Sequence, residues 1–425
     1  MKIKTREMSY EQVLSKPPYV HEKPRKQSPL FRMLIKYLSM FELWRAKFQY
    51  KEMGMEKLAP DQPCLILMNH SSFIDLEIVG KLFSSRPYQI VCTLDGLVGK
   101  KWLMRLIGCI PTKKFITDTA LVRDMVYCVK KLNSSIVMFP EASYSFDGTA
   151  TPLPESLGKC LKILGVPVVM VRTYGAFHRD PLYNGLRLRK IPVSAEVKYL
   201  LSPEDIQEKS PKELNKILQE QFAFDHFKWQ QENKVRIAED FRAEGLNRVL
   251  YKCPNCHSEG KMSGKGIRLI CQNCGKEYEL TEYGYMKALD GETEIDHIPD
   301  WYQWQRDCVR KELQEDTYEM DIPIDIYMMV NTDCVYKVGT GNLRHTKEGF
   351  HLTGCDGKLD YYQAPGASYS LYSDFFWYEI GDVICIGNTE VQYYCFPQGE
   401  EDIVAKARLA TEELYKLNGK SRKKS

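Results

Sequence analysis

The residue types best suited to chemistry in the first half of the chain are a histidine and an aspartate, His70 and Asp75. A carboxylate beside an imidazole fixes its tautomer, so that the second ring nitrogen can take a proton from an attacking hydroxyl group. The pair therefore predicts general-base catalysis on an alcohol. A histidine that only caps its own loop fits the same two residues, and the pair alone leaves both interpretations open.

A second chemical pattern consists of two Cys-x-x-Cys pairs, Cys253/Cys256 and Cys271/Cys274. The segment between the pairs is rich in glycine, serine and lysine. Four thiolates at this spacing complete a tetrahedral zinc site with no open position, which predicts a structural zinc ribbon of two knuckles around a short hairpin. His257 is adjacent but is not needed as a ligand. An element this small needs its metal to fold.

The elements around His70 place it at the end of a strand. Residues 64–68 are continuously apolar, as in a strand buried on both faces, and Ser71 and Ser72 are suitable N-caps for a helix that follows. Open α/β sheets bind ligands in crevices at the carboxyl ends of their strands. His70 is therefore predicted at such an edge, with Asp75 in the first turn of the next helix.

The chain then alternates between strand and helix patterns as far as residue 231. This alternation predicts an α/β layer with a largely parallel sheet. We expect strands at residues 88–92, 135–139, 166–171 and 193–200, the last near a sheet edge, and helices at 101–107, 120–132, 155–164 and 212–231.

The N-terminal segment combines a polar lead-in, residues 1–28, with an amphipathic helix. From Leu30 to Trp44, apolar and aromatic residues fall on one broad face, opposite Arg32, Lys36 and Ser39. This pattern is typical of a helix that lies in a membrane interface, and also of a helix packed on the protein's own core. The basic residues that follow favour an anionic membrane surface.

From residue 322 onward, short apolar runs alternate with turn signals such as Asp356-Gly357, which predicts a β-rich domain. Strands are expected at residues 322–330, 334–338, 349–353, 368–372, 375–379, 383–387 and 391–396, and a helix from Glu401 to Leu417. Such a series resembles a pleckstrin-homology-like roll. The predicted domains are a lead-in with an interfacial helix (1–54), an α/β domain (55–247), the zinc ribbon (248–282) and a β-rich domain with a C-terminal helix (283–425).

Bulk properties exclude other classes. The 425 residues, 44% hydrophobic and 27% charged, suit about three folded domains. The net charge is only +3, and the basic residues near the ribbon are few and lack interleaved aromatic residues, so we expect no nucleic-acid partner. No apolar run is long enough to predict a transmembrane helix, and the cysteine usage without a signal peptide favours a reducing cytosol. We therefore expect peripheral association with the cytoplasmic face of a membrane.

Two sequence blocks resemble the PlsC-like glycerolipid acyltransferase family. Asn69-His70 and Asp75 are similar to its histidine and aspartate with four residues between them. The segment Phe139-Pro-Glu-Ala-Ser-Tyr-Ser145, about seventy residues later, is similar to its Phe-Pro-Glu-Gly-Thr-Arg-Ser block. Residues 166–169 resemble its Val-Pro strand. The resemblance covers roughly residues 60–200, so the domain at 55–247 would be an acyltransferase-like layered sheet.

The resemblance implies transfer of a fatty acyl group from acyl-CoA or acyl-carrier protein to a hydroxyl of a lysophospholipid or related lipid, as in a 1-acylglycerol-3-phosphate O-acyltransferase. His70 would be the general base, with Asp75 as its orienting partner. Backbone N–H groups at residues 71–73 would bind the oxyanion. Glu141 would help to seat the acceptor, although an acidic residue capping a turn would look the same.

The chain departs from the family where the acceptor's phosphate would bind. Ala142, Ser143 and Tyr144 stand where the family has glycine, threonine and a phosphate-binding arginine, and tyrosine cannot replace a bidentate guanidinium. Lys114 and Arg172 are candidate cations, although a solvated lysine and a structural arginine fit equally well. The acceptor would then be a lysophospholipid bound in another way, or a lipid without a terminal phosphate. A catalytically silent, membrane-associated lipid-binding or scaffold protein on the same fold is the alternative.

Overall fold

A computed structural model describes residues 2–115, 119–399 and 402–422. Its contacts divide the chain into two compact units. Residues 21–181 and 187–226 form what we call the α/β unit, and residues 1–20, 182–186 and 227–425 form the ribbon-and-roll unit. The first twenty residues, a lead-in by sequence, thus group with the C-terminal half of the chain.

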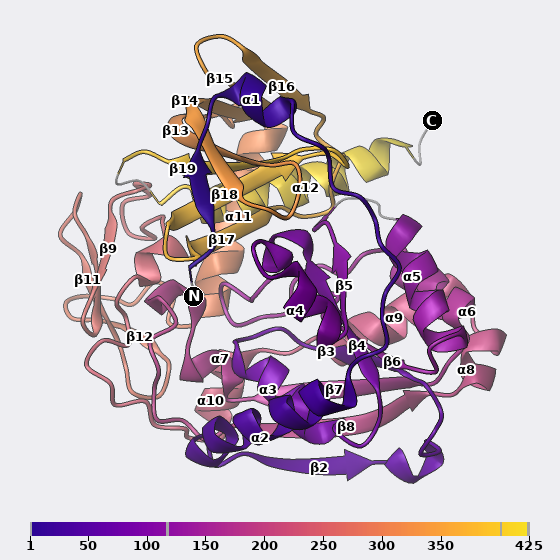
Figure 1. Ribbon diagram of the computed structural model, residues 1–425. Coiled ribbons are helices and arrows are strands. Elements are labelled where there is room, and N and C mark those ends of the chain that lie inside the picture. Colours follow the sequence, from indigo (N-terminus) through magenta and orange to yellow (C-terminus); the bar gives the residue numbers. More distant parts are fainter. Residues whose placement is uncertain (1, 116–118, 400–401, 423–425) are drawn as a thin grey trace. The chain divides into compact units, whose positions relative to one another are not determined.

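The α/β unit is built on a mostly parallel sheet with the strand order β2-β8-β7-β3-β6-β4-β5 (Figure 1). β8 runs antiparallel to β7 and the other pairs are parallel. The strands are β2 (Gln49–Met53), β3 (Leu65–Met68), β4 (Tyr88–Thr93), β5 (Cys109–Thr112), β6 (Ser135–Met138), β7 (Val168–Tyr174) and β8 (Ser194–Leu201). The helices are α2 (Pro29–Arg45), α3 (Ile74–Leu82), α4 (Lys101–Leu106), α5 (Thr119–Lys130), α6 (Leu157–Leu164), α7 (Ala176–Arg179), α8 (Pro203–Glu208) and α9 (Pro211–Phe222). The predicted α/β class is confirmed.

β3 lies in the middle of this sheet and is buried on both faces. Ile66 and Met68 pack in an apolar cluster with residues of α2 and α3, whereas Leu65 and Leu67 pack in a cluster with residues of α5, α6 and α9. Successive side chains of a strand point to opposite faces, so a strand covered by helices on both sides must be apolar throughout. This explains the continuous apolar run in the sequence.

One prediction about this unit is wrong. Residues 212–231 do not form one helix: α9 ends at Phe222, and α10 (His226–Glu232) begins after a break in which Asp225 forms an isolated β-bridge with Thr149. β8 lies near the sheet edge as predicted, and the edge itself is formed by β2, a strand that the sequence did not predict.

α2 packs on α3 through small residues. Ser39 is buried, its hydroxyl donates to the Ile35 carbonyl (2.8 Å), and a Cβ at Gly80 of α3 would approach Ile35 Cγ2 to 2.7 Å. Ser39, predicted on the outward polar face, therefore faces α3. The broad apolar face is exposed, so it is not the face by which α2 packs on the rest of this unit. Its exposed members are Leu30, Met33, Leu34, Tyr37, Leu38, Met40, Phe41 and Trp44.

Among the described helices, none is both long and apolar enough to cross a membrane.

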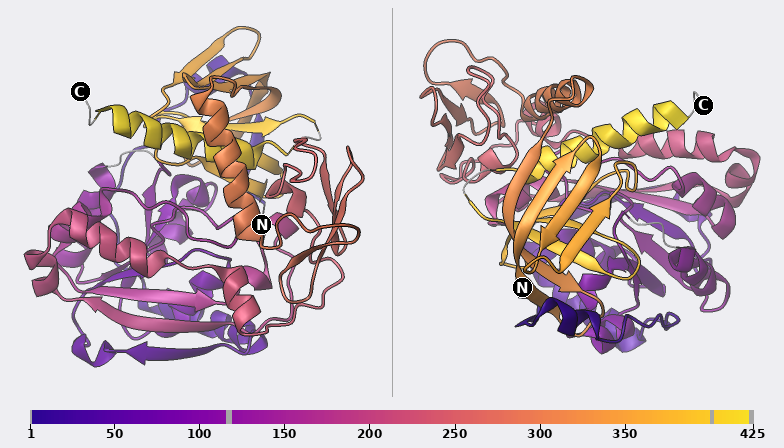
Figure 2. Two further views of the ribbon diagram at one scale, coloured as in Figure 1. Left: turned by 180° about the vertical axis from the view of Figure 1, so that it is seen from behind. Right: turned by 90° about the horizontal axis from the view of Figure 1, so that it is seen from above.

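The ribbon-and-roll unit contains two sheets. The ribbon sheet is antiparallel with the order β12-β11-β10-β9, made of β9 (Met262–Lys265), β10 (Arg268–Cys271), β11 (Glu277–Leu280) and β12 (Met286–Ala288). The roll has the order β16-β15-β14-β13-β19-β18-β17 and consists of β13 (Met320–Met329), β14 (Val335–Thr346), β15 (Gly349–Gly354), β16 (Leu359–Gln363), β17 (Tyr372–Trp377), β18 (Gly381–Gly387) and β19 (Gln392–Pro397). β1 (Thr5–Glu7) pairs in parallel with β14. The remaining helices are α1 (Tyr10–Leu14), α11 (Ile298–Gln314) and α12 (Val404–Arg422), and α12 lies against β17 and β18 (Figure 2).

The predicted β-rich region with a terminal helix is confirmed, with differences in detail. The runs 368–372 and 375–379 contribute to one strand, β17, rather than two, and the helix α11 and the strand β16 were not predicted. α12 begins at Val404, and Glu401, the predicted helix start, lies outside the described residues.

Candidate functional site

The two sequence blocks meet because their strands are neighbours. β3 and β6 are parallel, with Leu67 paired to Met138. The same register continued for three residues puts His70 beside Glu141. Glu141 Oε2 accepts a hydrogen bond from the His70 N–H (3.0 Å), and the Ser145 N–H donates to the His70 carbonyl (3.3 Å). The second block thus holds the backbone of His70 at both its N–H and its carbonyl.

The second block is itself a tightly bonded turn. Glu141 is buried, and its other carboxylate oxygen accepts from the Thr151 N–H (2.8 Å). Ala142, at the position of the family's glycine, has a φ of 58°, a left-handed conformation that glycine adopts most easily. Glu141 therefore supports the loop that carries His70, and its predicted contact with an acceptor stays a prediction.

His70 and Asp75 form a hydrogen-bonded pair, which we call the dyad. His70 Nδ1 lies 3.1 Å from Asp75 Oδ2, and the same oxygen accepts from the N–H groups of Ser71 (2.8 Å) and Ser72 (3.1 Å). Because a carboxylate only accepts, Nδ1 carries the proton and Nε2 presents its lone pair. Within the described residues, no group is hydrogen-bonded to Nε2, and 20% of the His70 side chain is exposed. An incoming hydroxyl group has an acceptor there.

The start of α3 differs from the prediction. Ser71 and Ser72 do not cap the helix, since Phe73 occupies the N-cap position without a side-chain hydrogen bond. Asp75 accepts from the two serine N–H groups instead. These two N–H groups are therefore not available to an oxyanion, and the prediction is wrong for them. For the N–H group of Phe73 it stays a prediction.

The surroundings keep the imidazole of His70 neutral. Its ring lies against the rings of Phe139 and Tyr144, each with a centroid distance of 4.3 Å. Burial lowers the pKa of His70, the contact with Asp75 partly opposes this, and the positive charge of Lys114 lowers the pKa further. A neutral imidazole at physiological pH is competent to accept a proton. The effect of Lys114 on this pKa also indicates a cation near the dyad.

The remaining predicted residues divide into two groups. Ser143 is buried within the second block, and Tyr144 contacts the ring of His70. Arg172 of β7 donates instead to the Gln221 carbonyl at the end of α9 and lies over the ring of Phe224, 5.6 Å from its centroid. These contacts assign Arg172 a structural place rather than one beside His70.

Two residues near the dyad were not predicted to act there. Asn69 Oδ1 accepts from the Thr173 N–H (2.9 Å) and so ties the end of β3 to β7. Ser71 Oγ lies 3.3 Å from Nε2 of His226, a residue 155 positions later. No motif marks His226, and the helical periodicity around it hides the break that brings it there.

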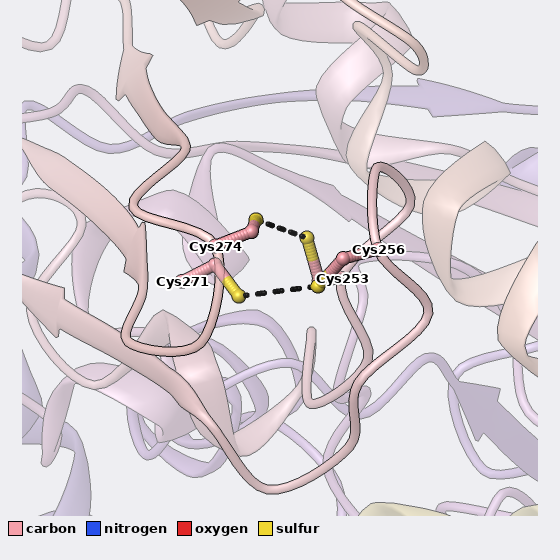
Figure 3. Close-up of side chains that lie close together, drawn as sticks. All are labelled: Cys253, Cys256, Cys271 and Cys274. Atoms are coloured by element: carbon pink, nitrogen blue, oxygen red, sulfur yellow. Dashed lines mark hydrogen bonds between the residues drawn. The ribbon is translucent and has the colours of Figure 1, made fainter.

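The predicted zinc ligands converge in the ribbon. The Sγ atoms lie 3.8 Å apart for Cys253 and Cys274 and 3.7 Å apart for Cys256 and Cys271, and all four lie within 4.8 Å of one another (Figure 3). Four sulfur atoms arranged tetrahedrally around zinc at 2.3 Å would be about 3.8 Å apart. The four thiolates therefore fit this ion.

Both knuckles share one geometry. His257 and Gly275, each directly after a Cys-x-x-Cys pair, have φ values of 60° and 75°, and each N–H donates to the carbonyl of its pair's first cysteine. The amides of Asn255 and Asn273 donate to ligand sulfur atoms at 3.4 and 3.6 Å. Donors to the thiolates stabilise a metal site and orient its ligands.

Parts of the chain are similar to known acyltransferases. Residues 22–173 match the model of the family described as Acyltransferase. A chloroplastic 1-acyl-sn-glycerol-3-phosphate acyltransferase of Brassica napus is 27% identical over 145 residues, which are 32% of this chain and 40% of that relative. The chain thus spans well under two thirds of the relative's length. The solved structure of the 1-acyl-sn-glycerophosphate acyltransferase PlsC of Thermotoga maritima has a TM-score of 0.36 and 19% identity, over 45% of this chain and 76% of that one.

Proposed function

We propose that this protein, whose residues 22–173 belong to the acyltransferase family, transfers a fatty acyl group from an acyl thioester to a hydroxyl of a lysophospholipid or related lipid. The observation that carries the proposal is the contact of His70 Nδ1 with Asp75 Oδ2, which leaves Nε2 available. The donor would be acyl-CoA or acyl-carrier protein. The reaction would resemble that of a 1-acylglycerol-3-phosphate O-acyltransferase, the activity named for the Brassica relative.

The reaction needs one base and no acyl-enzyme, because a thioester is already activated. Nε2 of His70 takes the proton of the acceptor hydroxyl as its oxygen attacks the thioester carbonyl carbon. The imidazolium that forms is stabilised by the buried Asp75 carboxylate, 3.1 Å from Nδ1. When the tetrahedral intermediate collapses, the carbon–sulfur bond breaks and His70 returns the proton to the leaving thiolate.

We propose that Lys114 is the cation that stabilises negative charge near His70, either on the phosphate of the acceptor or on the developing oxyanion. Its influence on the pKa of His70 supports this role. Tyr144, on the ring of His70, replaces the family's arginine, and Arg172 is occupied by the Gln221 carbonyl. A phosphate would therefore be bound by the ammonium group of a lysine rather than by a bidentate guanidinium. A lipid without a terminal phosphate remains the competing acceptor.

We further propose that α2 holds the protein on the surface of a membrane, with the cytoplasmic face as the expected location. The support is its exposed face, on which Trp44 is 76% and Phe41 62% accessible. Substituting glutamate for Trp44 should weaken flotation with liposomes that contain anionic lipid, whereas Tyr362→Glu, at an exposed tyrosine of the roll, should not. Equal flotation of both variants would contradict the role of α2.

The direct test of the enzymatic proposal compares wild type with His70→Ala, using labelled acyl-CoA or acyl-carrier protein and a panel of lysophospholipids and phosphate-free lipid alcohols. We expect transfer by wild type and its loss in the variant. His351→Ala is the matched control, because His351 forms an exposed pair with Asp360 (2.7 Å) in the roll. Equal rates for wild type and His70→Ala would refute the role of His70.

The alternative function, a catalytically silent lipid-binding or scaffold protein, is favoured by Tyr144 at the arginine position. Lipid binding by wild type without transfer to any acceptor would support it. The intact pair of His70 and Asp75 argues against it.

A further inference from the structure

The break between α9 and α10 places a buried histidine against the loop of the dyad. His226 is 4% exposed, and its Nε2 lies 3.3 Å from Ser71 Oγ. Asn69 Nδ2 donates to the same hydroxyl oxygen (3.1 Å). The tautomer of His226 decides whether Nε2 donates to the Ser71 hydroxyl or accepts from it. In either case the side chain of Ser71 is held between the Asn69 amide and the His226 imidazole.

The backbone of His226 is fixed as firmly as its ring. Its N–H donates to the Gly148 carbonyl (2.9 Å), just after the second sequence block, and its carbonyl accepts from Nε2 of His178 in α7 (2.9 Å). The ring stacks on Phe177, with a centroid distance of 5.3 Å and an angle of 22°. Burial lowers the pKa of His226 to about 3, so its imidazole stays neutral in its contact with Ser71.

Ser71 connects this support to the dyad. Its N–H donates to Asp75 Oδ2 at 2.8 Å, the oxygen that also meets His70 Nδ1. A displacement of Ser71 would therefore move the acceptor that orients the imidazole. Small displacements of catalytic groups can lower the reaction rate strongly.

We propose that His226 is a positioning residue of the acyl transfer: through Ser71, it fixes the turn that holds Asp75 against His70. The expected loss of rate rests on the proposed function. The expected displacement of Asp75 from His70 does not, because it can be observed without a substrate.

The test uses His226→Leu, His226→Gln, Ser71→Ala and the double variant Ser71→Ala/His226→Leu, each checked for folding by circular dichroism. His226→Leu should lower kcat about 10- to 100-fold with little change in KM. His226→Gln, whose amide can donate or accept a hydrogen bond, should recover most of the rate. The double variant should be no slower than the slower single variant, because both changes remove the same connection, the contact between Ser71 and His226.

The matched control is His345→Leu. His345 is a buried histidine of the roll that is hydrogen-bonded to Tyr318, and burial lowers its pKa to about 3.

A second readout does not need turnover. The contact with Asp75 raises the pKa of His70, so His226→Leu should move the NMR titration midpoint of His70 to lower pH, and the control should not. An unchanged midpoint in His226→Leu would overturn the inference. Absence of transfer by wild type would instead overturn the proposed function, so the two failures are distinguishable.

Discussion

The dyad and the cysteine cluster are both compact sites, but they are assembled in opposite ways. The dyad depends on contacts between His70 and Glu141, 71 positions apart, and between Ser71 and His226, 155 positions apart. The cysteines of the ribbon lie within one short segment, with Cys253 and Cys274 only 21 positions apart. The sheet supplies the first geometry, whereas the fit of four thiolates to zinc supplies the second. We therefore expect the first site to fail by loss of individual contacts and the second by loss of its metal.

The largest effect should come from removing the metal. We propose one structural zinc ion per chain at Cys253, Cys256, Cys271 and Cys274. Structural zinc contributes on the order of 10 kcal/mol to small domains, so chelation should abolish hydrogen-exchange protection across residues 252–280. Protection of residues 65–68 in β3 should persist. Mass spectrometry of exchange, combined with metal analysis, measures both.

Purified protein that lacks zinc and yet keeps full protection in the ribbon would contradict the proposed metal. Loss of protection in β3 on chelation would contradict the difference between the two sites.

A smaller but still large effect should follow from Asp75→Asn. The variant keeps an oxygen that can accept from the Ser71 N–H, but it removes the charge that stabilises the imidazolium of His70 in the proposed mechanism. We expect kcat to fall roughly 100-fold or more, as when a base loses its orienting carboxylate. Asp360→Asn, which alters the exposed pair with His351, is the matched control. A rate within twofold of wild type would show that Asp75 has no catalytic role.

The smallest expected effect concerns Ala142, whose φ of 58° is unfavourable for a residue with a Cβ. Ala142→Gly should raise the free energy of unfolding by up to about 1 kcal/mol, because relief of the left-handed strain exceeds the added flexibility of the unfolded chain. Ala150→Gly, at an alanine outside the left-handed region, should lower the same quantity slightly. Urea denaturation measures both changes, and a loss of stability in Ala142→Gly would refute the argument.

The elements that carry the dyad were predictable because their sequence patterns are local. The apolar runs ending at Met68 and Phe139 are visible in the sequence, and the resemblance of nearby residues to a family singles out His70, Asp75 and Glu141. What the patterns do not contain is the pairing of Leu67 with Met138, which follows from strand order.

The unpredicted features arise from tertiary contacts that override local preference. Ser71 and Ser72 look like helix caps, but the buried Asp75 carboxylate takes their N–H groups. The helical pattern continues through residues 223–225, yet the chain breaks there and Asp225 bridges to Thr149. For α11 a local signal did exist, since Trp301, Val309 and Leu313 are buried at helical spacing.

The measurement that tests the central claim most directly is the pH dependence of kcat/KM for acyl transfer by wild type and His70→Ala. Burial lowers the pKa of His70 from its usual value near 6.5, so the proposed base is neutral at neutral pH. Activity of wild type should be constant above about pH 7 and should fall only below about pH 6.5, as His70 is protonated. The residual rate of His70→Ala should lack this acidic limb. A wild-type limb centred above pH 7, or the same limb in His70→Ala, would contradict the assignment of His70 as the general base.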